Sequence, residues 1–292
     1  MAAQNRLARD VAELTGYFGP DSLTWRIGRE SVMILGGGRA VLMQLAHPLV
    51  AAGVGQHSGY ARDPWGRTTA TLELTQRIAF GTRAEANEAA RFINHLHLGV
   101  SGTLERDAGA FAPGTPYRAR QHDLLLWVHT TLVDTALLLY PQLVTPLTRA
   151  EQERYYEESK VAVTLLGLPY EAIPATLDAF KVYVSAMLDS NELAVTPEAL
   201  AVARVVPRMP APLVVRPLLA VGTQATIGWL PDRLRRQYGY SWDAGRQRLL
   251  AAATMGIRHL LPATPLLLRE TFWARAAERR VRHLRNLMDK PA

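Results

Sequence analysis

Apolar residues recur along this chain at the three-to-four-residue spacing of amphipathic helices, whereas the alternation that indicates strands is scarce. Start and stop signals divide the pattern into separate helices. The clearest case follows Asp63, an N-cap residue, and has Pro64 at its first helical position. Gly81 stands where a C-terminal cap belongs. These signals predict one helix over residues 64–80.

A second helix begins directly after the first, because Thr82 and Glu85 form a capping box. The segment 102–120, with its glycines and prolines, is predicted to be a loop, and 207–217 a bent connector between helices. The inward face of the second helix is predicted to be an apolar stripe formed by Phe92, Ile93, Leu96, Val100 and Leu104. The other predicted helices cover residues 123–140 (stopped by Pro141), 148–167 (opened by the Thr148–Glu151 capping box), 174–188, 196 onward, 231–239, 242–258 and 265–288.

No internal repeat, low-complexity tract or convincing linker divides the chain. Residues 1–292 are therefore predicted to form a single multi-helix, all-α domain. The composition, with 48% hydrophobic and 20% charged residues, is typical of a globular protein. No run approaches the roughly 18 uninterrupted apolar residues of a membrane span, and residues 1–10 lack the apolar core of a secretory signal. These patterns favour a cytoplasmic protein without a transmembrane segment.

The chain contains no cysteine, which excludes several kinds of site at once. Disulfides, iron–sulfur clusters, thiolate-bound haem, covalently attached c-type haem and cysteine-based zinc sites all need that side chain. A bound metal would therefore be held by histidine, by carboxylates or by the ring of a cofactor.

The net charge of +7 comes almost entirely from arginine. No nucleic-acid-binding motif accompanies the arginines, so a solvated, arginine-rich surface is predicted and a nucleic-acid partner is not. The last helix is basic and amphipathic, with Trp273, Val281, Leu284 and Met288 on one side. Two interpretations of it stay open: a weak contact with an acidic membrane surface, or a cap on the helical bundle with a solvated face.

Two histidines fall on apolar helix faces. His97 is in line with Ile93 and Val100, whereas His129 shares a face with Leu125 and Val133. A buried imidazole needs a partner, which is a hydrogen bond, a carboxylate or a metal. Each is therefore either a satisfied structural histidine or part of a functional site.

Arg67 and Thr71 lie one turn apart near the start of the 64–80 helix. A guanidinium and a hydroxyl beside free backbone N–H groups suit a carboxylate, such as a haem propionate or a substrate acid. The alternative is an exposed arginine in a cap region. His47, before Pro48, is predicted to end a helix, and His57 is predicted to lie in a glycine-bearing turn.

Several common catalytic motifs are absent from the sequence. The three glycines at 36–38 lack the order of a dinucleotide or phosphate loop and predict a helix junction instead. There is no GxSxG elbow, no HExxH and no Glu-x-x-His pair of the di-iron bundles.

A longer, ordered set of segments resembles the MpaB/rubber-oxygenase catalytic domain family, which includes the latex-clearing proteins and the mycophenolic-acid side-chain oxygenase. The set is GGGRAVLMQLAHPLVAAGV, HSGYARDPWGRTTAT, FGT, NHLHLGVSGTL, DLLLWVHTTLV, YYEESKVAVTLLGLP and LPDRLRRQYGYSW, and it extends over nearly the whole chain. The resemblance implies an all-α fold with a globin-like helical core. It also implies non-covalent haem b and the use of O2 to cleave C=C bonds in isoprenoid chains.

The resemblance also implies roles for individual residues. His97 matches the proximal iron ligand, and Arg67 and Thr71 match residues that support the haem. His129 matches a nearby histidine and is taken, with Thr71, as a candidate catalytic residue. His57 is added to the candidate cofactor-binding residues.

This chain departs from the rubber-cleaving branch at two places. Ala70 stands where that branch has a lysine, and residues 47–56 contain no Asp or Glu to serve as its upstream base. The leading hypothesis is therefore a haem b-dependent oxygenase that uses O2 on a small hydrophobic, unsaturated or isoprenoid substrate, not on polyisoprene. The alternatives are a haem carrier or sensor without turnover, and a metal-free protein that binds an apolar ligand or a membrane surface.

Overall fold

A computed structural model describes residues 11–57, 63–205 and 216–288 of the chain. Helices dominate this part, as the sequence predicts. The first half contains α2 (Leu23–Gly28), the 3-10 helix η1 (Ser31–Gly36), α3 (Gly37–Leu45), α4 (Pro48–His57), α5 (Pro64–Phe80), α6 (Arg83–Leu98), β1 (Ser101–Thr103), β2 (Pro116–Arg118) and α7 (His122–Leu143). The second half contains α8 (Arg149–Leu165), η2 (Tyr170–Ala172), α9 (Leu177–Asp189), α10 (Pro197–Val205), α11 (Arg216–Trp229), α12 (Asp232–Gln237), α13 (Ala244–Leu260), η5 (Leu261–Ala263), α14 (Leu266–Arg269) and α15 (Phe272–Met288).

Local capping sets the boundaries of the helices that the sequence predicts best. The Asp63 side chain accepts a hydrogen bond from the Gly66 amide at 2.8 Å, and α5 covers residues 64–80 as predicted. Thr82 and Glu85 exchange hydrogen bonds at the start of α6, which completes the predicted capping box. The second predicted box, Thr148 with Glu151, opens α8 in the same way.

Other boundaries differ from the prediction for identifiable reasons. Pro141 does not stop α7, which continues to Leu143, because a proline in the last turn removes a single helix hydrogen bond. The predicted helix over 174–188 starts later, as α9, because Thr176 caps it by accepting a hydrogen bond from the Ala179 amide. The segment 102–120 is largely loop, but its ends pair as an antiparallel β1–β2 hairpin.

The predicted terminal helix over 265–288 is two helices, α14 and α15. The chain breaks where Glu270 forms an isolated β-bridge with Glu30. The Thr271 amide donates to the Arg29 carbonyl oxygen at 2.8 Å, which ties the break to the N-terminal region. Most of the predicted 207–217 connector lies outside the described residues.

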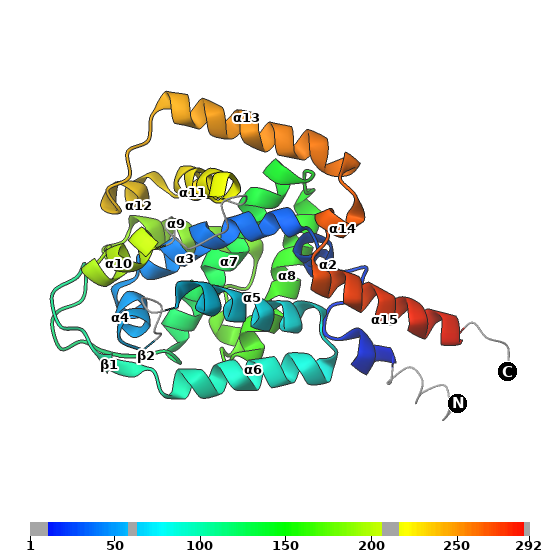
Figure 1. Cartoon of the computed structure of the whole chain (residues 1–292). Coiled ribbons are helices and arrows are strands. Elements are labelled where there is room, and N and C mark those ends of the chain that lie inside the picture. Colours follow the sequence, from blue (N-terminus) through cyan, green and yellow to red (C-terminus); the bar gives the residue numbers. More distant parts are fainter. Residues whose placement is uncertain (1–10, 58–62, 206–215, 289–292) are drawn as a thin grey trace.

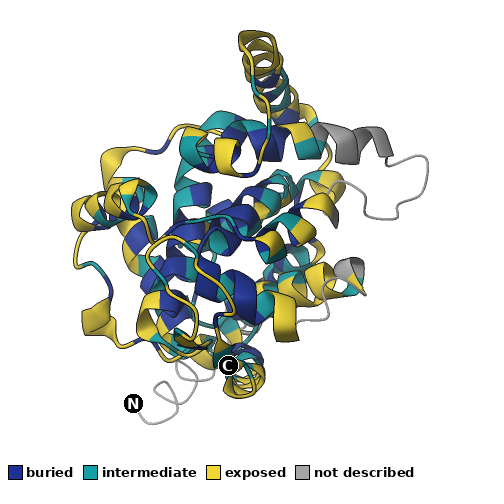
Figure 2. Cartoon of the chain, turned by 90° about the vertical axis from the view of Figure 1, so that its left-hand side faces the viewer, coloured by how far each residue is buried: buried dark blue, intermediate teal, exposed yellow. Residues whose placement is uncertain are grey.

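Helix α7 runs through the middle of the fold, in contact with α3, α8, α9 and α13 (Figure 1). By length and composition it is apolar enough to cross a membrane, yet 61% of the relevant stretch is buried among its neighbours. Its exposure is that of the core helix of a bundle. Buried residues gather at the centre and exposed ones on the outer helices (Figure 2).

The three-glycine segment is a helix junction, as predicted, with η1 ending at Gly36 and α3 beginning at Gly37. A Cβ atom on Gly38 would lie 2.4 Å from Oγ1 of Thr226 in α11, and one on Gly36 would lie 2.8 Å from Leu139 of α7. The glycines therefore let α3 approach two other helices closely, and their role is packing.

Helices α5 and α6 form an antiparallel hairpin that packs through α5 on α2 and α15 (Figure 1). The buried face of α6 consists of Ala86, Ala89 and Ala90, whose small side chains suit close helix packing. The predicted stripe is wrong at Phe92 and Leu96, which are 52% and 41% exposed. A hydrophobic pattern identified the helix but not the side that packs.

Candidate functional site

The α5–α6 hairpin brings two predicted site residues to one end of the fold. Arg67 lies in the first turn of α5 and His97 in the last turn of α6. Because the helices are antiparallel neighbours, the start of α5 and the end of α6 lie at the same end of the hairpin (Figure 1). The turn at Gly81, at the opposite end, is the part packed against α2 and α15.

His97 lies on the inward face of α6. It follows Ala86, Ala90 and Ile93 at helical spacing, so its side chain points to the side that packs. The ring is partly buried, and its Nδ1 atom is shielded from solvent without a hydrogen-bond partner among the described residues. Burial, with the nearby positive charge of Arg120, lowers the pKa of His97. The imidazole is therefore neutral near pH 7, which is the form that ligates metals.

Arg67 and Thr71 lie on one face of α5 with Leu74 and Ile78, and burial falls steadily along that face. Ile78 is buried, Leu74 is half-buried, and Thr71 and Arg67 are exposed. The Thr71 hydroxyl donates to the Arg67 carbonyl oxygen at 2.9 Å, and the Arg67 side chain has no ion-pair partner in the described part of the chain. Among the described residues, the first half of α5 thus carries a guanidinium without an ion-pair partner on an exposed surface.

His129 is buried on α7 against α8. Its Nε2 atom lies 3.5 Å from Oγ of Ser159, whose hydroxyl donates to the Tyr156 carbonyl oxygen at 2.7 Å. Burial lowers the pKa of His129 to about 4, so the ring is neutral at physiological pH. His129 therefore lies in the contact between α7 and α8. Its catalytic role stays a prediction.

His57 is the last residue of α4 and does not lie in a turn as predicted. The ring is exposed, with Nε2 3.0 Å from the Ser101 carbonyl oxygen, and it meets the Tyr117 ring edge-on. These contacts tie α4 to the β1–β2 hairpin. Its predicted cofactor contact stays a prediction.

His47 is a buried polar residue that lies between α3 and α4, next to the helix end that the sequence predicts there. It follows α3, as predicted, but it is only 2% exposed, and its Nδ1 atom has no hydrogen-bond partner within the described residues. Burial lowers its pKa to about 4, although the charge of Asp123 opposes this. The apolar segment on either side of His47 was the signal that it would be buried.

Apolar side chains are exposed on two helices of this region. Leu132, halfway along the central helix and one turn after His129, is 44% exposed. Phe92 and Leu96 of α6 are also exposed; Leu96 directly precedes His97, and Phe92 lies five residues before it. An exposed leucine on a core helix marks a part of α7 that the described residues leave open to solvent.

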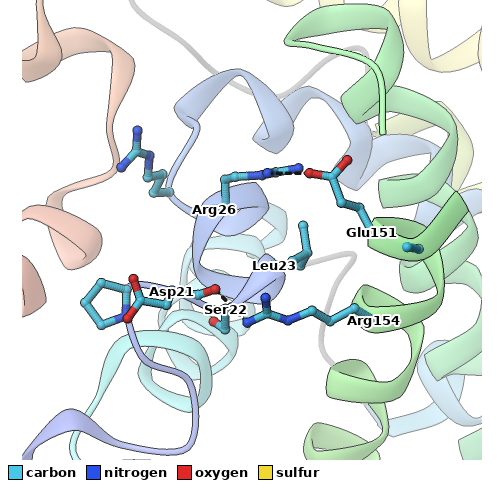
Figure 3. Close-up of a pocket in the computed structure, with 9 residues that line it drawn as sticks. Asp21, Ser22, Leu23, Arg26, Glu151 and Arg154 are labelled. Carbon is cyan, nitrogen blue, oxygen red and sulfur yellow. Dashed lines mark hydrogen bonds and ion pairs between the residues drawn. The ribbon is translucent and has the colours of Figure 1, made fainter. Parts of the chain in front are cut away.

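Two pockets of the structure lie away from His97 and Arg67. One, of about 500 Å³, separates α2 from α8 and is polar (Figure 3). There Arg26 pairs with Glu151 at 2.7 Å, and Arg154 donates to the Asp21 carbonyl oxygen. The other, of about 590 Å³, lies between α7, α11 and α13. Neither is lined by a predicted site residue, so the site inference depends on the histidines and the hairpin.

The number of metal-ligating side chains near His97 limits which kind of metal site this region can form. In the ranges 11–57, 63–205 and 216–288, no group of three or more His, Asp or Glu side chains is placed to hold a metal ion. A single imidazole holds a metal firmly when a cofactor ring supplies the other ligands. A neutral ring with an unpartnered buried nitrogen, beside exposed apolar residues and a free arginine, fits that case.

The fold defines an all-α protein assembled around one buried central helix. Comparison with known proteins gives its family. The chain belongs to the family of the ER-bound oxygenase mpaB/B'/rubber oxygenase catalytic domain, whose profile matches residues 24–259. The fold is similar to that of latex clearing protein LCP in the closed state, with a TM-score of 0.55, 20% identity and coverage of 90% of this chain and 72% of that one. No curated protein matches the sequence.

Proposed function

We propose that this chain is a haem b-dependent oxygenase that acts with O2 on a small hydrophobic, isoprenoid-like substrate. Membership of an oxygenase family supports the reaction class. The observation that carries the haem assignment is His97, a neutral imidazole on an inward helix face with a buried nitrogen that no described residue engages.

The residues around His97 suit the parts of a haem. His97 would hold the iron, and Arg67, which has no ion-pair partner in the described residues, would pair with a propionate. Thr71, one turn further along the same face, would add a hydrogen bond. The exposed Leu132, Phe92 and Leu96 would lose their contact with water against the porphyrin or the substrate.

When bound, haem supplies the activation of O2. The chain's own residues then position the reactants and exclude water. Ala70 is not ionisable, the segment 47–56 contains no Asp or Glu, and His47 and His129 are weak bases because burial lowers the pKa of each to about 4. His129 can therefore orient a polar group by a hydrogen bond at neutral pH, but it is poorly suited to remove a proton. This supports a substrate whose oxidation needs little acid–base assistance.

The test uses two histidines of one helix. The protein, made in haem-supplemented cells, is expected to show a Soret band and about one iron per chain. His97→Ala is expected to lose or shift the band and most of the iron. His95→Ala is the matched control, because His95 is exposed on the other side of α6, and it is expected to keep both. A normal band and iron content in His97→Ala would refute the ligand assignment.

A haem carrier or sensor is the second candidate, favoured by Ala70 and by the absence of an acidic residue in 47–56. It predicts the same spectrum and the same effect of His97→Ala, but no O2 consumption with unsaturated isoprenoids. Steady, substrate-dependent O2 uptake by the haem-loaded protein, lost in His97→Ala, would decide for the oxygenase.

A further inference from the structure

The positive charge of the chain is concentrated near its C-terminus. Residues 244–288 hold nine arginines, no lysine and two glutamates. Of the 33 basic and 26 acidic residues in the sequence, this leaves 24 of each elsewhere. The whole excess of +7 therefore belongs to the segment that forms α13, α14 and α15, and the rest of the chain is balanced.

The same segment exposes a group of large apolar side chains, which we term the leucine tip. Its members are Leu260 (69% exposed), Leu266 (61%), Leu267 (70%), Leu268 (67%) and Phe272 (63%). They lie at the end of α13, on α14 and at the start of α15, which meet on one side of the molecule (Figure 1). Single exposed apolar residues are common on protein surfaces, but five within thirteen residues indicate a surface that binds another molecule.

The leucine tip is held on the core by polar contacts of its backbone and flanks. Ser31 Oγ donates to the Leu268 carbonyl oxygen at 2.7 Å. Arg269 makes a two-pronged pair with the buried carboxylate of Glu30, both N–O distances being 2.8 Å. These contacts fix the backbone of α14 while its three leucines stay in solvent. The exposure is thus part of the folded structure.

Helix α15 continues the leucine tip as a basic stripe. Ala274, Ala277 and Val281 pack inward against Trp25 and Phe80. On the opposite side, helical spacing aligns Phe272 with the arginine stripe, which consists of Arg275, Arg279 and Arg282. Arg279 and Arg282 are exposed, whereas Arg275 is half-buried and its Nε atom is shielded from solvent. In the described part of the chain, none of these three arginines forms an ion pair.

We propose that the leucine tip and the arginine stripe dock this protein on the surface of a membrane that contains anionic lipids. The leucines would enter the boundary between headgroups and acyl chains, and the arginines would contact lipid phosphates. A second copy of the chain is disfavoured as the partner because each copy carries the same local excess of positive charge. Nucleic acid is disfavoured because it offers no apolar phase for five exposed side chains.

The test measures flotation of the full chain with vesicles. Vesicles with about one phosphatidylglycerol in three lipids are expected to bind it at about 0.1 M NaCl, and at least about tenfold more weakly at about 0.5 M NaCl. Vesicles of phosphatidylcholine alone are expected to bind it weakly at both salt concentrations. No haem or substrate is needed, so the outcome is independent of the proposed oxygenase function.

Two variants separate the apolar and the basic contributions. The triple change L266S/L267S/L268S and the double change R279E/R282E are each expected to reduce binding to anionic vesicles about tenfold or more. The matched control is K181E/V182S on α9, which also alters an exposed cation and an exposed apolar residue and is expected to bind like the parent. Helical circular dichroism and an unchanged melting temperature show that each variant is folded.

Three results would overturn the proposal. The first is equal binding to neutral and anionic vesicles, or binding unaffected by R279E/R282E. The second is an oligomer, seen by light scattering, that L266S/L267S/L268S converts to a monomer while vesicles bind neither form, which would assign the patch to a second copy. The third is salt-sensitive binding to DNA with none to anionic vesicles.

Discussion

Nη2 of Arg39 lies 2.6 Å from Oδ2 of Asp134, which joins α3 to the central helix α7. The same guanidinium donates from Nη1 to Thr135 Oγ1 at 2.6 Å and from Nε to the Trp229 carbonyl oxygen at 2.8 Å. One buried side chain thereby connects three helices. The arginine of the GGGR segment is a structural residue, and its removal would leave buried acceptors without donors.

Arg39→Met is expected to lower the free energy of unfolding by about 3 kcal/mol, because it breaks a largely buried ion pair and strands its partners. Arg149→Met is the control, since Arg149 pairs with Glu153 and Asp178 on an exposed surface and its loss should change stability little. Urea unfolding followed by circular dichroism measures both. Equal effects of the two changes would contradict the assigned role of Arg39.

Gly38→Ala is expected to destabilise the protein by about 1–3 kcal/mol, because the new methyl group would lie 2.4 Å from the Thr226 hydroxyl. Truncating the obstacle should relieve part of this cost, so Gly38→Ala with Thr226→Ala is expected to be more stable than the sum of the single changes predicts. A double-mutant cycle in urea measures the coupling. Strict additivity would show that the contact is not the cause.

Protonation of the buried histidines is expected to make stability depend on pH. The pKa of His129 and that of His47 are each lowered by burial to about 4, whereas an unfolded histidine titrates near 6.5. Well above pH 6.5 both states are neutral and the two residues contribute no slope. As pH falls to 5, the unfolded chain takes up protons that the fold rejects, so each histidine should cost on the order of 2 kcal/mol.

The measurement for this prediction is the free energy of unfolding at a series of pH values between 7 and 5. His129→Gln should flatten the curve by about half of the histidine contribution, and His95→Gln, at an exposed position, should leave it as it is. An unchanged slope in His129→Gln would show that this histidine is protonated equally in both states.

Leu132 and Leu139 lie on the same helix and differ in exposure, at 44% and 0%. Leu139→Ala should cost about 2–5 kcal/mol, because it leaves a cavity in the core. Leu132→Ala should cost less than about 1 kcal/mol, since the leucine is already open to solvent. Similar losses in urea unfolding would mean that the face of α7 near Leu132 is covered after all.

Arg67→Ala is expected to weaken retention of haem about tenfold if the arginine pairs with a propionate. Arg91→Ala removes an exposed arginine from the outer side of α6 and is expected to have no effect. Transfer of haem to an acceptor protein, followed by absorbance, gives the rates. Equal rates for the two variants would separate Arg67 from the haem site.

The sequence predicted what local chemistry decides. Asp63, Thr82 and Thr148 cap their helices within three or four residues, so their signals are complete in the sequence. The break between α14 and α15 was missed because it depends on Glu30, which lies 240 residues from Glu270. The buried position of Arg39 was not predicted either, because its hydrogen-bond partners lie far away in the sequence, in α7 and α11.

The candidate site shows the same division. The inward direction of His97 followed from its spacing with Ile93, and the structure places it on the packed side of α6. The packing partners of that helix did not follow, because three alanines rather than Phe92 and Leu96 make the contact. A periodic pattern gives the geometry of a helix, whereas the neighbouring helices decide which side is covered.

Burial decreases along α5 from Ile78 towards Arg67, and this affects how a cofactor would bind. Helix α5 packs against α6, but none of its residues from 66 to 75 is buried, and a helical segment with so little burial is only marginally stable in water. A flat apolar cofactor that binds against Arg67 and Thr71 would supply the apolar contacts that these turns lack. Cofactor binding and the ordering of these turns are then one equilibrium, because part of the binding free energy is used to order the helix. The protein with its cofactor bound is therefore expected to have a higher melting temperature than the protein without it.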